Sequence, residues 1–168
     1  IGINEALTLG FRLEASKQRS NYGLESAFRI GMLGTVGLQL AQSRDQESGT
    51  GNAGIFRYSY QERGFNFHFS KYQLSNHYLP IWINSTSDRT RSQNLAGIGY
   101  GSLSTGTIDL STSSTQTFQG VESNAKTLGY SKSLGHNLTF FANLTRITGS
   151  EPDKQLTLGL NWYPGKNL

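Results

Sequence analysis

The chain has 168 residues, of which 35% are hydrophobic, and its 15 Lys and Arg against 11 Asp and Glu give a net charge of +4. The absence of cysteine excludes disulfides and cysteine metal sites, and the basic residues are scattered singly rather than in a phosphate-binding stripe, so we expect no nucleic-acid partner. With 9 Phe, 8 Tyr and 2 Trp the chain is not disordered, yet its hydrophobic fraction is low for a protein that fills a central core.

Hydrophobic and polar residues alternate with a period of two along most of the chain, and turn residues separate the alternating stretches. This pattern predicts ten strands, each with one apolar and one polar face. In chain order, the strands are expected at residues 3–16, 20–31, 35–44, 53–62, 64–75, 93–101, 103–115, 124–133, 136–147 and 154–163.

The connections between these strands are predicted to alternate in length. Short ones are expected at 32–34, near 63, near 101–102 and at 134–135, and longer ones at 17–21, 45–52, 76–92, 116–123 and 148–153. Short periplasmic turns and longer extracellular loops are typical of outer-membrane barrels. The sequence therefore predicts an all-β fold, a transmembrane antiparallel β-barrel with about ten strands and both chain ends on the periplasmic side.

The alternation also assigns residues to faces. The lipid-facing side should carry Leu9, Phe28, Leu38, Phe67, Leu110, Phe140 and Leu158. The lumen-facing candidates are Arg12, Glu14, Glu25, Arg29, Gln39, Arg57, Asn66, His68 and Asp109. If residues 17–20 close the first hairpin, Arg12 lies opposite Glu25 and Leu9 opposite Phe28. Lys132 shares the apolar parity and should mark a strand end near a lipid headgroup.

The residues that could carry chemistry are dispersed. His68, His77 and His136 lie in different predicted strands or loops, and Asp45, Asp88 and Asp153 have no spacing that joins a base to an orienting group. The glycine-rich stretches 31–37 and 48–54 are interpreted as turns, since neither has the lysine of a phosphate-binding loop. We expect no metal, no cofactor and no enzymatic activity.

Four stretches carry a resemblance to a known family. They are G-I-N-E-A-L-T-L-G-F-R-L-E-A-S (2–16), Y-G-L-E-S-A-F-R-I-G-M-L-G (22–34), F-R-Y-S-Y-Q-E-R-G-F-N-F (56–67) and L-G-Y-S-K-S-L-G-H-N-L-T-F-F-A (128–142). In order and spacing they resemble the barrel of fimbrial outer-membrane usher proteins. The resemblance implies a bacterial outer-membrane location in contact with lipid. It also implies secretion of pilus subunits, with periplasmic chaperone–subunit complexes as partners.

The chain departs from that family in size. It has no counterpart of the usher's plug, of its periplasmic N-terminal domain or of its C-terminal domains, and it has fewer strands than the usher pore. We therefore expect residues 1–168 to be a wall segment of a larger barrel, and we carry over no family binding residue. The alternative is a self-contained ten-stranded outer-membrane barrel that acts as a protease or adhesin.

The longest predicted connection contains H-Y-L-P-I-W-I-N at residues 77–84. Two hypotheses account for this hydrophobic cluster. It could supply an aromatic girdle and a loop folded on the barrel rim. Alternatively, Tyr78 and Trp82 could contact the plug or a passing pilus subunit.

Overall fold

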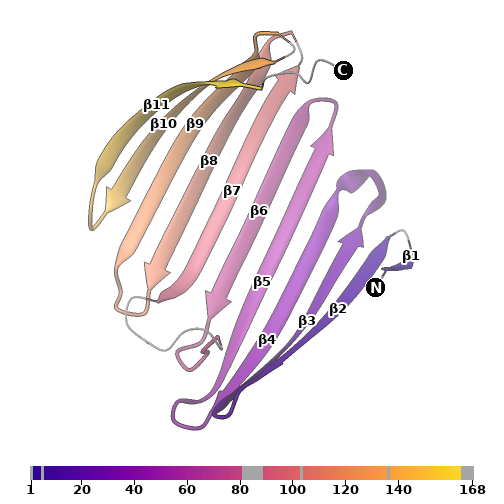
Figure 1. The fold of residues 1–168 in the computed structure, drawn as a ribbon, viewed down its shortest axis with the longest axis vertical. Helices are drawn as coiled ribbons and strands as arrows, with labels where there is room; N and C mark the ends of the chain where they lie inside the picture. The colour runs from indigo at the N-terminus through magenta and orange to yellow at the C-terminus, as the bar shows by residue number, and fades with distance from the viewer. Residues whose placement is uncertain (1, 5, 81–88, 103, 136, 164–168) are drawn as a thin grey trace.

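The computed structural model describes residues 2–4, 6–80, 89–102, 104–135 and 137–163. These residues form one antiparallel sheet in which every strand pairs with the next one along the chain (Figure 1). Its strands are β1 (Gly2–Asn4), β2 (Leu7–Ala15), β3 (Arg19–Arg29), β4 (Thr35–Asp45), β5 (Gly49–Glu62), β6 (Phe65–Leu74), β7 (Thr90–Ser102), β8 (Gly106–Thr117), β9 (Glu122–Ser133), β10 (Leu138–Gly149) and β11 (Asp153–Trp162). One short 3₁₀ helix, η1 (Gly31–Leu33), lies between β3 and β4. The described residues contain no helix with the length and hydrophobicity needed to span a membrane.

The predicted all-β meander is confirmed, with the first predicted strand divided into β1 and β2. The finer prediction, that this sheet belongs to a barrel, is not shown, because the described residues form an open sheet. Among the described residues, β11 pairs only with β10, and the strands at the other edge, β1 and β2, pair only with each other and with β3. A sheet closes only when its strands together curve through a full turn. This sheet curves but leaves its two edges apart (Figure 1).

The predicted alternation of short and long connections is wrong. Four of the five connections expected to be long contain only residues 16–18, 46–48, 118–121 and 150–152, and only the β6–β7 connection, residues 75–89, is long. The strands continue into segments that are polar on both faces, such as residues 90–92 at the start of β7 and 122–123 at the start of β9. Hydrophobic alternation stops in such segments although the backbone ladder continues, so the sequence pattern mistakes strand ends for loops.

The predicted register of the first hairpin is also wrong, by two residues. Arg12 lies opposite Gly23, and Glu25 lies opposite Gly10. The loop is tighter than expected because the Ser16 amide donates to the Arg19 carbonyl at 2.7 Å, and the Arg19 amide donates to Ser16 Oγ at 3.2 Å. A shift of two residues preserves the face of every side chain, so the predicted faces survive this correction.

Glycines on the polar face give room to side chains from neighbouring strands. A Cβ at Gly10 would overlap the Glu25 carboxylate, one at Gly97 would overlap the His68 ring, and one at Gly159 would overlap the Phe141 ring. The side chains of Glu25, His68 and Phe141 therefore lie over neighbouring glycines on this face.

Candidate functional site

One face of the sheet carries a continuous surface of exposed hydrophobic side chains, which we call the apolar belt. The register aligns its members from strand to strand: Leu110, Leu128, Leu144 and Leu156 are successive cross-strand neighbours on β8 to β11. Its exposed members include Leu9, Phe11, Leu13, Leu24, Phe28, Leu38, Leu40, Phe56, Ile98, Tyr100, Ile108, Leu110, Leu128, Leu144, Leu156, Leu158, Leu160 and Trp162. A patch of this extent is far larger than the surface of a soluble monomer normally exposes.

Aromatic pairs add contacts within the belt on the β5–β6 hairpin. The ring centroids are 6.1 Å apart in Phe56–Phe69, 5.8 Å in Tyr58–Phe67 and 5.9 Å in Tyr60–Phe65, and all three pairs are tilted or edge-on. Such pairs stabilise a hairpin by about 0.5 to 1.5 kcal/mol each beyond their burial.

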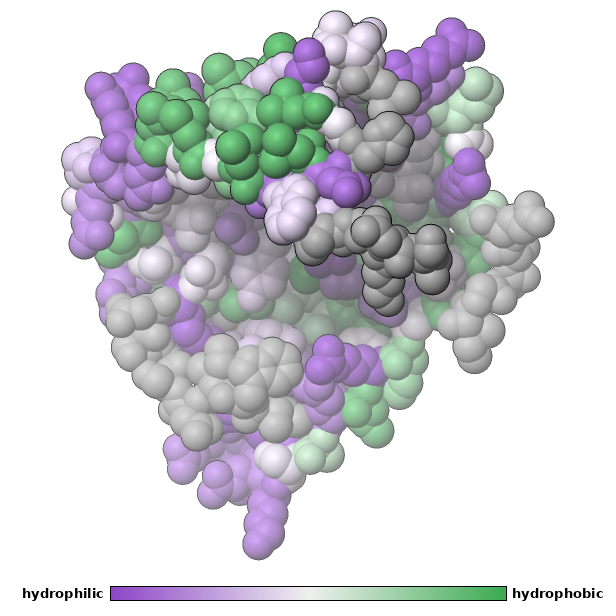
Figure 2. Space-filling model, turned by 45° about the horizontal axis from the view of Figure 1, so that its top comes forward, coloured by the Kyte–Doolittle hydropathy of each residue, from purple (hydrophilic) through white to green (hydrophobic). Residues whose placement is uncertain are grey.

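The belt ends at a sharp boundary within the strands. On β4 the exposed face changes from Leu38 and Leu40 to Gln42 and Arg44, and corresponding changes occur on β6 to β11. On β10 the hydrophobic positions run from Leu138 to Leu144, about 20 Å along the strand. The exposed face therefore has an apolar zone beside a polar zone. In Figure 2, hydrophobic side chains are gathered in one area, and hydrophilic ones lie along the rim of a hollow.

The opposite face carries all nine residues predicted to face a lumen. The structure brings some of them together: the Arg12 guanidinium is paired with the Glu14 carboxylate, and Gln39 Nε2 donates to Glu25 Oε2 at 3.2 Å. Asn66 and Asp109 both lie over Gly99. Arg29, Arg57 and His68 are spread along the same face.

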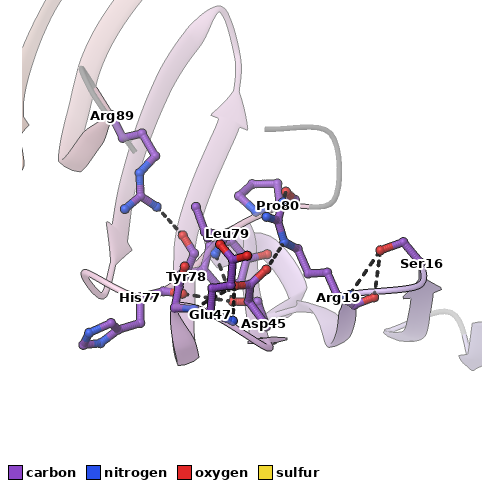
Figure 3. Close-up of polar contacts among 11 residues, drawn as sticks. Ser16, Arg19, Asp45, Glu47, His77, Tyr78, Leu79, Pro80 and Arg89 are labelled. Atoms are coloured by element: carbon purple, nitrogen blue, oxygen red, sulfur yellow. Dashed lines mark hydrogen bonds and ion pairs between the residues drawn. The ribbon is translucent and has the colours of Figure 1, made fainter. Parts of the chain in front are cut away.

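The start of the β6–β7 connection, residues 75–80, folds onto this polar face, and we call it the docked segment (Figure 3). Leu79 is 3% exposed, and its amide donates to Ser43 Oγ at 3.0 Å. Ser43 is fully buried, and a Cβ at Gly51 would overlap the backbone of Tyr78. The segment thus covers the far ends of β4 and β5, beyond the level at which the belt ends on the other face.

An ion pair between β3 and β4 includes the arginine that binds the docked segment. Arg19 Nε donates to Asp45 Oδ2 at 2.8 Å, while Arg19 Nη1 donates to the Pro80 carbonyl at 2.9 Å. Asp45 Oδ1 also accepts the amides of Glu47 and Ser48, which closes the β4–β5 turn. The hydrogen bond from Arg19, reinforced by that from the Ser48 amide, lowers the pKa of Asp45 from 3.8 to about 2.

A second arginine, Arg89, holds the same segment from the position just before β7. Arg89 donates to the carbonyls of Tyr78 and Asn76, and its guanidinium lies 4.9 Å from the centre of the Phe118 ring. Tyr78, one of the two predicted loop contacts, is therefore already packed against the sheet through its backbone. Trp82, the other, lies outside the described residues.

Among the residues that the structure describes, the dispersed candidates are not brought together into a catalytic or metal site. Asp45 is paired with Arg19, the His77 ring points away from the cluster in Figure 3, and Asp153 lies at the start of β11, seven strands from β4. His136 and Asp88 lie outside the described residues. In the part of the chain that the structure describes, no group of three or more His, Asp or Glu side chains could hold a metal ion.

The predicted site residues do not include Arg19, Ser43 or Arg89, which hold the docked segment. Their partners are mostly backbone carbonyls and amides of residues 76–80, which no sequence pattern specifies. The sequence does contain a signal for the role of Asp45. An aspartate whose carboxylate can accept hydrogen bonds from the amides two and three residues later is typical of a turn.

Comparisons with protein-family models, curated proteins and solved structures give no match to this chain.

Proposed function

We propose that residues 1–168 form part of the wall of a bacterial outer-membrane barrel, with the apolar belt against lipid and the polar face toward a water-filled lumen. The observation that carries this proposal is the segregation of the two faces across ten consecutive strands. Every strand from β2 to β11 has 9 to 14 residues, enough to cross a bilayer at a tilt. A belt of exposed hydrophobic side chains opposite a polar, glycine-rich face suits a wall between hydrocarbon and water.

The two edges of the sheet favour a barrel with more strands than these. Backbone groups on an unpaired edge cost several kcal/mol each in hydrocarbon, so both edges of the sheet must pair with further strands. The alternative is that the sheet closes on itself by pairing β2 with β11, which would need more curvature than this sheet has. We therefore propose that this segment lies within a larger barrel.

We further propose that the larger barrel is the pore of a fimbrial usher, which secretes pilus subunits delivered by periplasmic chaperones. The sequence resemblance in four stretches supports this identity, and the lumen-facing surface suits the task. Arg12, Glu14, Glu25 and Asp109 mix both signs of charge, so the wall would not bind a passing folded subunit tightly. The segment supplies passive surface and no catalysis.

Deletion of the gene tests this function directly. Surface fibres should disappear and chaperone-bound subunits should accumulate in the periplasm, and the intact gene should restore both. A deletion strain that keeps its fibres but loses surface proteolysis or host-cell attachment would instead support a small barrel acting as a protease or adhesin.

A further inference from the structure

Three cations stand side by side on the belt side of the sheet. Arg146 on β10 lies directly opposite Lys126 on β9 and directly opposite Lys154 on β11. The three side chains therefore form a line across three strands, which we call the cationic row. The next line on the same face is Leu128, Leu144 and Leu156, the last of the apolar belt.

The cationic row has no counter-charge of its own. All three residues are exposed, and within the described part of the chain none of them forms an ion pair. The same face of β9, β10 and β11 carries one carboxylate, Glu122, which lies two rows farther from the belt and accepts a hydrogen bond from Gln116 at 2.9 Å. Like charges directly opposite one another destabilise a sheet. A bound anion would therefore reduce the electrostatic repulsion among these three side chains.

We infer that the cationic row binds the phosphate groups of anionic lipids in the leaflet at that end of the barrel. This inference rests on the proposed function, because the belt must contact hydrocarbon for a headgroup to reach this level. Lipid phosphates lie where the acyl chains end, and the row lies where the belt ends. Arginine can bind a phosphate through two parallel hydrogen bonds, and each lysine adds a compact positive charge.

The spacing of the row also fits a lipid surface. Neighbouring strands lie about 4.8 Å apart, so the three side chains span about 10 Å, the scale of one headgroup or two adjacent phosphates. Lys132 lies on the same face of β9, six residues from Lys126, with Leu128 and Tyr130 between them. The hydrophobic part of this strand is therefore bounded by a cation at each end, as expected of a segment between two headgroup layers.

Other cations on the same face provide a matched control. Arg44 lies opposite Ser20 and Thr50, and Lys71 lies opposite Phe56 and Asn94, so neither is next to another cation. The double variant R44Q/K71Q removes one arginine and one lysine from this face without touching the row, as K126Q/R146Q does within the row.

The test uses the full-length protein reconstituted in phosphatidylcholine membranes with spin-labelled phosphatidylglycerol or spin-labelled phosphatidylcholine. Electron spin resonance then measures the lipid immobilised on the protein. We expect phosphatidylglycerol to be preferred about fivefold for each cation of the row that engages its headgroup, since about 1 kcal/mol per cation corresponds to about fivefold. The triple variant K126Q/R146Q/K154Q should lose the preference, and R146Q alone or K126Q/R146Q should reduce it. The matched control R44Q/K71Q should retain it, as should the wild type in millimolar inorganic phosphate.

An unchanged preference in K126Q/R146Q/K154Q, or equal losses in K126Q/R146Q and R44Q/K71Q, would overturn the inference. Loss of the preference in inorganic phosphate would assign the row to free phosphate instead of lipid. Failure of the proposed function looks different, since a protein without a lipid-facing belt would immobilise neither lipid. If the triple variant does not fold, as judged by its heat-dependent mobility on gels, the lipid preference of R146Q is compared with that of the wild type instead.

Discussion

Phe140 and Asn143 are three residues apart on β10, and the register puts them on opposite faces. Phe140 lies among belt residues, between Lys132 and Leu160, with its ring 6.4 Å from that of Tyr130. We predict that Phe140→Arg destabilises the protein in lipid by about 2 to 4 kcal/mol, because an arginine would enter hydrocarbon. Asn143→Arg should be tolerated on the polar face. Urea unfolding in lipid vesicles measures both, and equal stabilities would contradict the assignment of faces.

Asp45 makes the docking of residues 75–80 sensitive to acid. It lies past the end of the belt on β4, outside the part of the strand that we propose to be in the membrane, and it is 7% exposed. Because its pKa is lowered to about 2 in the folded state, its stabilising effect is complete above its ordinary pKa of 3.8 and is lost as the pH falls through about 2.

We therefore predict that a nitroxide at His77→Cys, an exposed position that follows the backbone motion of the docked segment, becomes more mobile as the pH falls from about 4 to about 2. Adding Asp45→Asn, which removes the charged partner of Arg19 at a cost of about 2 kcal/mol, should give the label this higher mobility at neutral pH as well. Electron spin resonance measures the mobility. An unchanged mobility in the Asp45→Asn protein would show that the ion pair does not hold the segment.

At the scale of the elements, the β2–β3 hairpin offers a direct test of register. Arg12 lies opposite Gly23, whereas Glu25 is displaced by two residues along the strand. Cysteines at positions 12 and 23 should therefore form a disulfide faster than cysteines at 12 and 25, because directly opposite positions bring the Cβ atoms within reach. Non-reducing gels after mild oxidation compare the two pairs. A faster reaction at 12 and 25 would support the looser hairpin that the sequence predicts.

The strands could be predicted from the sequence because each carries its own alternation, independent of its neighbours. Leu7, Leu9, Phe11 and Leu13 identify the face of β2 without knowledge of β3. Register depends instead on the turn, and at Ser16 a side-chain hydrogen bond that the pattern does not contain tightens the loop by two residues. Strand ends were missed where both faces are polar, as in residues 90–92 at the start of β7.

The cationic row and the docked segment could not be predicted for a related reason. Lys126, Arg146 and Lys154 are scattered singly along the sequence and become neighbours only once the registers of β9, β10 and β11 are fixed. The contacts of Arg19 and Arg89 with backbone carbonyls of residues 76–80 depend on the path of the β6–β7 connection. Sequence patterns describe faces well, but they do not describe contacts between distant segments.

At the scale of the whole molecule, the two faces of the sheet and the boundary of the apolar belt fit a single arrangement. Apolar side chains cover one face up to a line that crosses the strands, the cationic row lies just beyond that line, and the docked segment covers the polar face near the same end. The central claim is that the belt faces hydrocarbon and the opposite face meets water.

Scanning β10 with nitroxide labels tests that claim most directly. Each of residues 138 to 145 would be replaced by cysteine in the full-length protein, labelled and reconstituted in lipid. Collision rates with oxygen, which concentrates in hydrocarbon, and with a water-soluble nickel complex are then compared. The account predicts a period of two: oxygen dominates at Leu138, Phe140, Ala142 and Leu144, and the nickel complex at the residues between them. Uniform access of the nickel complex to all eight positions, or a reversed alternation, would contradict it.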